Sequence, residues 1–195
     1  MQIRTLLAVA CAALPLLAAA QESTSSKTSG DANELGNVIA SYAKRSGKKF
    51  VLDARTRASV DLAGLDASKL TYDELLTVIN VNMFVAYTDG DVTVVVPDSA
   101  ARQVPSPVFT DPKFTAHDGE LVTLLMTPKN ACALQLVPVL RPMMPQAAHL
   151  AAEMVSNTLI INDRAINVRR IAELVRDLDR AAPEGKRCEM TLKKD

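Results

Sequence analysis

The stretch from residue 120 to residue 179 decides the fold of this chain. Its three informative segments are ELVTLLMTPKNACALQLVPVLRPMMP (120–145), SNTLIIND (156–163) and VRRIAELVRDLD (168–179). Apolar and β-branched runs in them predict strands, and apolar residues at helical spacing predict helices. The predicted order is strand, helix, strand, strand, helix. Such a βαββα module, KH-like in its order, is a small sheet packed against helices, and this stretch adds no catalytic groups to it.

Both helices of this module carry local signals. We expect Asn130 to cap a helix from 131 to about 140, and Asp163 to cap the last helix. Pro138 lies inside the first of them and removes one backbone hydrogen bond, so a kink or an early end is expected there. The last helix has a charged surface beside its apolar stripe, and such a surface is either simply solvated or a docking face. Its charged residues are Arg164, Arg169, Arg170, Glu173, Arg176, Asp177 and Arg180.

A second module is predicted from residue 31 to residue 97. Two helices each begin with a capping-box pair, Asp31 with Glu34 and Thr71 with Glu74. About four strands are expected, at 49–52, 60–65, 84–88 and 91–96. The apolar stripes of the two helices consist of Leu35, Val38, Ile39, Tyr42 and Ala43, and of Tyr72, Leu75, Leu76, Ile79 and Met83. The fold class is therefore α+β, with two small sandwich-like modules.

The last two strands of that module form the clearest hairpin. Asp89 and Gly90 lie between β-branched runs, which favours a type I′ turn centred on these two residues. Gly47 is expected to end the first helix.

Other segments are assigned from composition. Residues 1–20 are typical of an export signal, with a basic start, a short apolar run and small residues before the expected cleavage site. Residues 21–30 are polar and expected to be disordered. Residues 98–118, together with Pro97, hold four of the ten prolines and predict a semi-rigid linker to the module at 119–180. Residues 181–195 are a tail.

The tail permits two interpretations. Cys188, Met190 and Leu192 alternate with polar residues, as in a strand that starts a further repeat, whereas a frayed polar tail explains the same residues. Cys132 and Cys188 are the cysteines left after removal of the signal. Export would allow them to pair, but sequence alone leaves the pairing open.

Composition argues against several functions. The chain has 22 basic and 22 acidic residues, so it lacks the positive charge that nucleic-acid binding needs. Its two histidines, His117 and His149, belong to no motif with metal-ligand spacing. Nucleophile elbows and phosphate-binding loops are also missing from the sequence. We therefore expect no catalytic residues, no cofactor, no metal and no enzymatic activity.

Both modules resemble the N-terminal periplasmic domains of bacterial secretins, the outer-membrane channels of type II secretion and type IV pili. The second resembles the short repeated, NolW-like domain, through TPKNA (127–131), LVPVLRP (136–142), NTLII (157–161) and the terminal Leu178-Asp179. The first resembles the domain that secretins share with TonB-dependent receptors, through GKKFVLD (47–53), LTYDELL (70–76) and VVVP (94–97). No channel-forming region follows before Asp195, so no channel is expected.

The resemblance implies a non-enzymatic, exported protein of the periplasm, associated with the outer membrane, that takes part in protein secretion through ring or partner contacts. The expected partners are secretion components, a secretin or a second copy of the chain. Two alternatives are a periplasmic signalling adaptor and a truncated, decayed secretin. The partner-binding residues are expected on sheet edges, at Val92, Val94 and Val96 in the first module and at Leu121, Thr123 and Leu125 in the second.

Overall fold

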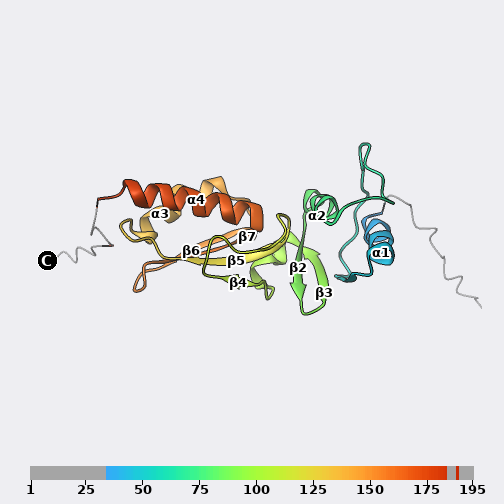
Figure 1. Cartoon of the computed structure of the whole chain (residues 1–195), viewed down its shortest axis with the longest axis horizontal. Coiled ribbons are helices and arrows are strands. Elements are labelled where there is room, and N and C mark those ends of the chain that lie inside the picture. Colours follow the sequence, from blue (N-terminus) through green and yellow to red (C-terminus); the bar gives the residue numbers. More distant parts are fainter. Residues whose placement is uncertain (1–33, 184–187, 189–195) are drawn as a thin grey trace, which may run out of the picture.

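The computed structural model describes residues 34–183 and Cys188, and it has two lobes side by side along its long axis (Figure 1). The expected export signal, the polar segment after it, Asp31 and most of the tail lie outside the described residues. The first lobe contains α1 (Leu35–Ser46), β1 (Lys49–Leu52), α2 (Tyr72–Val81), β2 (Phe84–Asp89) and β3 (Val92–Pro97). The second contains η1 (Asp98–Gln103), β4 (Val108–Phe109), β5 (Leu121–Met126), α3 (Ala133–Leu140), η2 (Arg141–Met143), β6 (His149–Glu153), β7 (Thr158–Arg164) and α4 (Ala165–Ala181). The predicted α+β class is confirmed.

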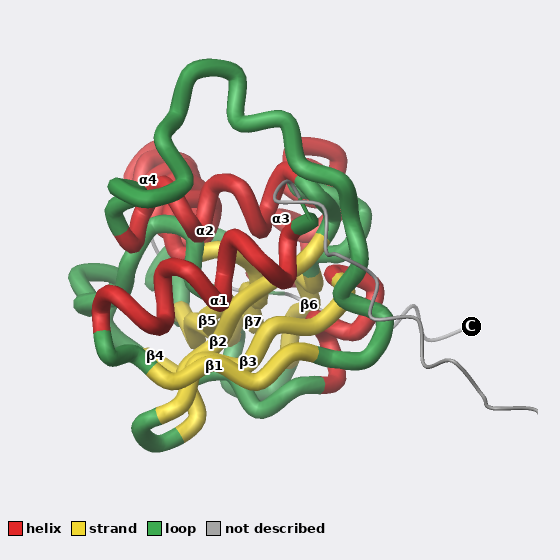
Figure 2. Tube along the Cα trace, turned by 90° about the vertical axis from the view of Figure 1, so that its right-hand side faces the viewer, coloured by secondary structure: helices red, strands yellow, loops and turns green. Residues whose placement is uncertain are grey.

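The first lobe packs α1 and α2 on one face of a sheet with strand order β1-β3-β2 (Figure 2). The predicted stripe of α1 is buried at Leu35, Val38, Ile39 and Tyr42, and Gly47 ends the helix with a φ of 72°. The capping box of Thr71 and Glu74 is present at the start of α2. Local signals therefore predicted the start of α2 and the end of α1 correctly. The predicted capping box of Asp31 and Glu34 was wrong, because Glu34 is itself the N-cap of α1 and its side chain caps nothing.

Two further local predictions in this lobe were wrong. Residues 60–65 form no strand, because φ is positive at Ala63 and Gly64 and turns the chain there. The first sheet therefore has three strands. Met83 leaves the stripe of α2, since the helix ends at Val81 and Met83 is exposed with a φ of 64°.

The hairpin forms as expected, but its turn is centred one residue later. Asp89 pairs with Val92, so Gly90 and Asp91 are the two central residues. Only Gly90 of this pair has a positive φ, 60°, which is the pattern of a type II′ turn. Glycine is suited to that first central position, and a type I′ turn would require positive φ at both residues.

The second lobe has the predicted βαββα order, with β4 added at one edge. Its sheet order is β4-β5-β7-β6, and α3 and α4 both lie on one face of it (Figure 1). The helix caps differ from the prediction: the N-cap residues are Cys132 and Arg164, without side-chain caps. Asn130 and Asp163 lie just before them, and Asp163 instead accepts a hydrogen bond from the Arg164 backbone amide. Helix α3 ends two residues after Pro138.

The segment 98–118 is folded and packed, unlike an extended spacer. It contains η1 and β4, and β4 pairs in parallel with β5. Phe109 stacks on Phe114, with ring centroids 4.7 Å apart, and Phe114 is buried in the core of the second lobe. Apolar residues outweigh the prolines here because burying a large apolar side chain is worth about 1.5–3 kcal/mol.

A disulfide joins Cys132 to Cys188, with 4.8 Å between their Cα atoms. Cys132 is buried at the start of α3, so the bond ties the chain after α4 to the second lobe. The question that the sequence left open is thereby answered in favour of pairing.

We predict that reduction of this disulfide destabilises the protein. The bond spans 56 positions, and closing a loop of that length stabilises a fold by about 4 kcal/mol in the chain-entropy description. Urea unfolding with and without reductant measures the difference. The double variant Cys132→Ser/Cys188→Ser is the control, because its free energy of unfolding should be the same with and without reductant. Titratable thiols of Cys132 and Cys188 in the untreated protein would contradict the prediction.

Candidate interaction surfaces

The six residues predicted to bind a partner lie on central strands, so their assignment to sheet edges was wrong. β3 is paired on both sides, by β1 and β2, and β5 is paired by β4 and β7. Val92, Val94 and Thr123 have a registered partner on both sides, so a partner strand finds no free backbone there. Val96, Leu121 and Leu125 each pair on one side only, although they too lie on central strands. Alternating β-branched residues mark a strand, but strand order depends on pairings between distant segments, which alternation does not reveal.

Three of these residues instead join the two lobes. Val96 and Leu121 are buried in one apolar cluster, and Val94 packs against its side. The other members come from β2, η1 and the segment after it: Val85, Tyr87, Ala100, Ala101 and Val104. The first sheet thus has helices on one face, and on the other this cluster covers β2 and β3 while Val51 of β1 stays exposed.

Polar contacts at residues 117–120 complete this junction. The Glu120 carboxylate accepts a hydrogen bond of 2.9 Å from the Tyr72 hydroxyl. The His117 ring meets the Tyr72 ring edge-on at 4.7 Å, and its Nδ1 lies 2.9 Å from Asp73 Oδ1. Burial, as the largest cause, raises the pKa of Tyr72, so the hydroxyl remains a donor to Glu120. His117 therefore belongs to a contact between the lobes.

Gly119 permits a close approach between the lobes. A Cβ atom at this position would lie 2.6 Å from the Cβ of Leu76 and 2.7 Å from Nδ2 of Asn80, both on α2. Asn80 also donates a hydrogen bond to the Gly119 carbonyl. Any side chain at residue 119 would push α2 away from the second lobe.

The outer side of α3 and of η2, which follows it, is an exposed apolar surface, which we call the α3 face. Leu134 is 48% exposed, Val139 57% and Met143 45%. Pro138 and Pro142 are exposed beside them. Gln135 is exposed among these residues, and Arg170 donates to the Met143 carbonyl at one end. An exposed apolar surface of this kind is typical of a contact site.

The loop before α3 is fixed by buried and charged hydrogen bonds. The Asp179 carboxylate accepts from the backbone amides of Lys129, Asn130 and Ala131 at 2.7–3.0 Å. The buried Asn157 side chain accepts from the Ala133 amide and donates to two carbonyls of the same loop. These contacts, with the disulfide, hold the α3 face in one position.

The opposite face of the second sheet carries no helix in the described part of the chain (Figure 1). Alternation and register place Val108, Thr123, Leu125, Ile160 and Ala151 on this open sheet face. Val108 is exposed, and the other four are partly exposed. The second lobe therefore presents apolar groups on two opposite sides.

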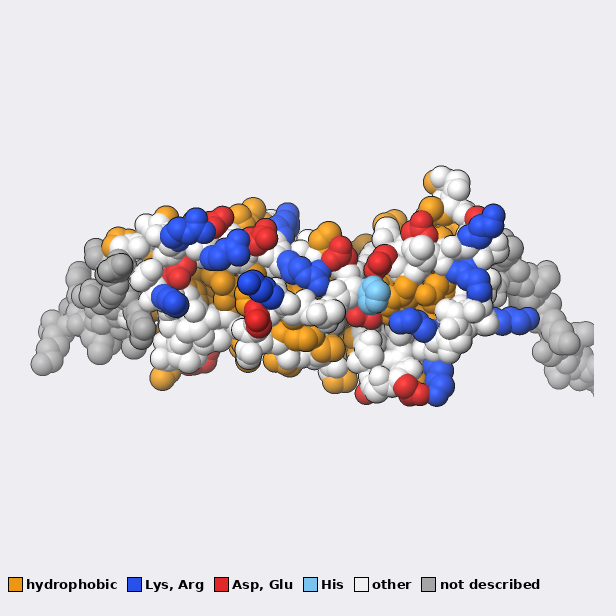
Figure 3. Space-filling view, viewed as in Figure 1, with side chains coloured by type: hydrophobic (Ala, Val, Ile, Leu, Met, Phe, Trp, Pro, Cys, Tyr) orange, Lys and Arg blue, Asp and Glu red, His pale blue; other side chains and the backbone are white. Residues whose placement is uncertain are grey.

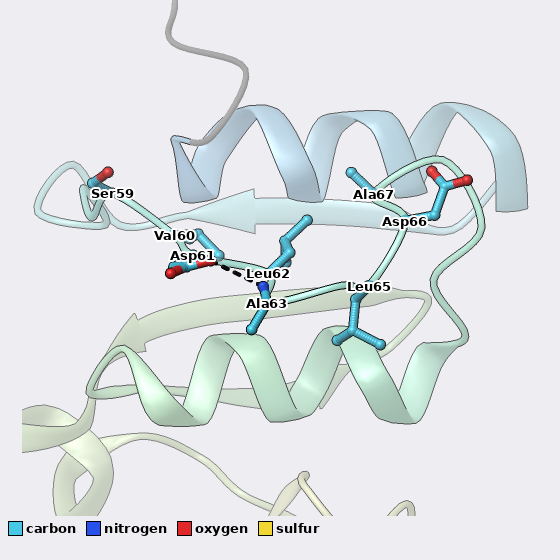
Figure 4. Close-up of a pocket in the computed structure, with 8 residues that line it drawn as sticks. All are labelled: Ser59, Val60, Asp61, Leu62, Ala63, Leu65, Asp66 and Ala67. Atoms are coloured by element: carbon cyan, nitrogen blue, oxygen red, sulfur yellow. Dashed lines mark hydrogen bonds between the residues drawn. The ribbon is translucent and has the colours of Figure 1, made fainter.

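Hollows in the described part offer little for catalysis. One is formed by loop 59–67 beside α1 and α2, where the Asp61 carboxylate accepts from the Ala63 amide (Figure 4). The acid side chains there stabilise their own turns. Among residues 34–183 and Cys188, no three His, Cys, Asp or Glu side chains converge as metal ligands, and no helix is long and apolar enough to cross a membrane.

Comparisons with known proteins agree with this architecture. Residues 123–184 match the bacterial type II/III secretion system short domain. The chain is 32% identical over 136 residues to the secretin XcpQ of Pseudomonas aeruginosa, covering 68% of this chain and 20% of that protein. It is 29% identical over 172 residues to the secretin GspD of Vibrio cholerae, covering 85% and 25%. The chain spans a fifth to a quarter of the length of these relatives.

Among solved structures, a chain of the Klebsiella pneumoniae type II secretion system outer membrane complex of PulD, PulS and the PulC HR domain has the same fold. The TM-score is 0.65 at 24% sequence identity, with 76% of this chain and 26% of that chain covered. The resemblance inferred from sequence motifs is confirmed.

We predict that Gly119→Ala loosens the junction. The added methyl group overlaps α2, and overpacking of this kind costs about 1–3 kcal/mol. Urea unfolding and limited proteolysis near residue 118 measure the effect. Gly36→Ala is the control, because its new Cβ would find only Leu52 Cδ1, at 3.9 Å. Equal stability of Gly119→Ala and the native protein would contradict the close approach.

We predict that Asp179 contributes stability that acid removes. Partial burial opposes its ionisation, but the three backbone amides outweigh this and lower its pKa. A lowered folded-state pKa means that the contribution is complete above the unfolded pKa, near 4, and disappears as pH falls through the folded value. Asp179→Asn should cost about 2 kcal/mol at pH 7. Urea unfolding of both proteins from pH 7 to pH 2 should show the difference shrinking with acid. A difference independent of pH would contradict the assignment.

Proposed function

We propose that this chain, which is built like the N-terminal domains of bacterial secretins, is a non-enzymatic interaction module of type II protein secretion in the periplasm. Its similarity to secretins of two organisms supports the secretion role. The expected export signal at residues 1–20 supports the location. The apolar α3 face supports binding to other proteins.

The two apolar sides of the second lobe favour association between copies of the chain. The α3 face lies on one side of the sheet and the open sheet face on the other. Contact between unlike surfaces repeats from copy to copy, and it closes into a ring when the rotation per copy permits. A pair of different, opposite surfaces suits such a contact better than it suits a twofold dimer.

Because the junction fixes the first lobe to the second, association of the second lobes would also position the first lobes. Because the lobes share the cluster around Val96 and Leu121, stacking the second lobes would also set the first lobes in a fixed array. The array would present α1, α2 and the free edge of β1 to secretion partners. Partner binding at the first lobe would then depend on assembly at the second.

The test is the mass of the exported protein in solution, combined with chemical crosslinking. Val139→Glu and Met143→Glu place a charge on the α3 face and should shift the protein toward monomer, by about tenfold in the association constant. Val155→Glu is the matched control, because Val155 is 96% exposed at the β6–β7 turn, away from both faces.

Two outcomes would contradict the proposal. The native protein could remain a monomer at high concentration and form no crosslinks with secretion components in the periplasm. Alternatively, the control variant could dissociate the assembly as strongly as the variants on the α3 face.

A further inference from the structure

A hollow beside α4 has a composition that the proposed function does not explain. It holds about 250 Å³, lies between α4, the segment 110–114 and the end of β5, and is called the α4 slot below. Its lining residues are Pro112, Lys113, Met126, Arg169, Ala172, Glu173 and Arg176. Figure 3 looks onto this side of the molecule, where orange side chains are visible between α4 and β5 with blue side chains around them.

The apolar floor of the slot follows from small and flexible residues at a bend of the surface. Ala172 is buried, and because its side chain is short, the surface of α4 has a depression at this point. Met126 is partly buried against the same core. The opposite wall is held in place because Phe114 is buried below it and Arg169 lies over the Phe114 ring at 4.8 Å.

The charges around the slot are only partly compensated. Arg169 is paired with Asp118 at 2.5 Å and also donates to the Ala116 carbonyl. Its charge is therefore already compensated, and its side chain forms part of the wall of the slot. Lys113 is exposed, and none of the ion pairs between described residues includes it. Arg176 is 60% exposed and lies 3.9 Å from Asp177, which Arg180 holds more closely at 2.8 Å.

Glu173 is the one acidic residue of the lining, and it forms no ion pair with a described residue. Lys113 and Arg176 therefore face an apolar floor with a single opposing charge between them. Two under-compensated cations above a hydrophobic hollow complement a group that is both apolar and negatively charged.

We propose that the α4 slot binds a short segment of a protein partner in which an apolar side chain is flanked by glutamate or aspartate. The apolar side chain would occupy the floor formed by Met126 and Ala172, and the carboxylates would pair with Lys113 and Arg176. The slot lies on α4, away from the α3 face and the open sheet face. It can therefore be tested apart from association between copies.

A peptide suits this slot better than an anionic membrane surface. The hollow has the size of one or two side chains, and beyond it on α4 Arg180 is paired with Asp177 while Arg170 donates to the Met143 carbonyl. The whole chain has a net charge of +0, so no net positive charge draws it toward anionic lipid.

The test measures binding of three fluorescein-labelled heptapeptides to the full chain by anisotropy at low salt. In the first peptide glutamate alternates with leucine, in the second lysine alternates with leucine, and in the third glutamate alternates with serine. The first peptide should bind more tightly than both others, because it alone has apolar side chains for the floor and carboxylates for Lys113 and Arg176. Its affinity should fall with added salt.

Variants then locate the site. Lys113→Glu and Arg176→Glu should each weaken binding of the first peptide by about fivefold, and the double variant by about twentyfold. Glu173→Gln should strengthen it by about twofold. Arg180→Glu is the control on the same helix and should have little effect, and thermal melts establish that all variants fold.

Several results would overturn the proposal. They are no binding of the first peptide, equal binding of the lysine peptide, or equal losses in Arg180→Glu and Lys113→Glu. Binding to phosphatidylglycerol vesicles that is lost in the double variant, without peptide binding, would identify a lipid surface instead. Because solution mass is measured for the same variants, a failure here is distinguishable from a failure of the proposed assembly.

Discussion

The burial of Val96 and Leu121 between the two sheets is the constraint on which the rest of the structure depends. Each lobe is small, and small domains bury too little surface to be robust alone. The shared cluster supplies burial that neither lobe has by itself. Gly119 brings the two parts close enough for this, and Glu120 extends the contact by bridging to Ala86 on the outer edge of β2. The lobes are consequently one unit with a fixed mutual orientation.

That fixed orientation connects the surfaces to the proposed function. The α3 face is held by Asp179, Asn157 and the disulfide, and the open sheet face by continuous strand pairing. A rigid arrangement of unlike surfaces can repeat from copy to copy without loss of conformational entropy on assembly. Flexible lobes would spend much of the contact energy on becoming ordered.

Sequence reasoning succeeded where the signal is local. The capping box at Thr71 and the glycine stop at Gly47 lie within a few residues of the structure they specify. It failed where contacts between segments distant in the sequence determine the structure. β3 and β5 were expected at sheet edges, but β1 pairs in parallel with β3 and β4 with β5, so both are central strands. The prolines of 98–118 predicted an extended linker. Two of the four phenylalanines, Phe109 and Phe114, lie in the same segment and indicate that it is packed. The α4 slot joins Lys113 to Arg176, and no periodicity relates them.

The central claim, that the two lobes form one rigid unit, is tested most directly by a distance distribution between spin labels on α1 and α4. Labels at Lys44 and Arg180, both exposed, would be attached with the native disulfide intact and measured by pulsed electron spin resonance in frozen solution. The account predicts a single narrow distribution, unchanged by salt. A broad or multimodal distribution would show lobes that move independently on a flexible linker and would contradict it.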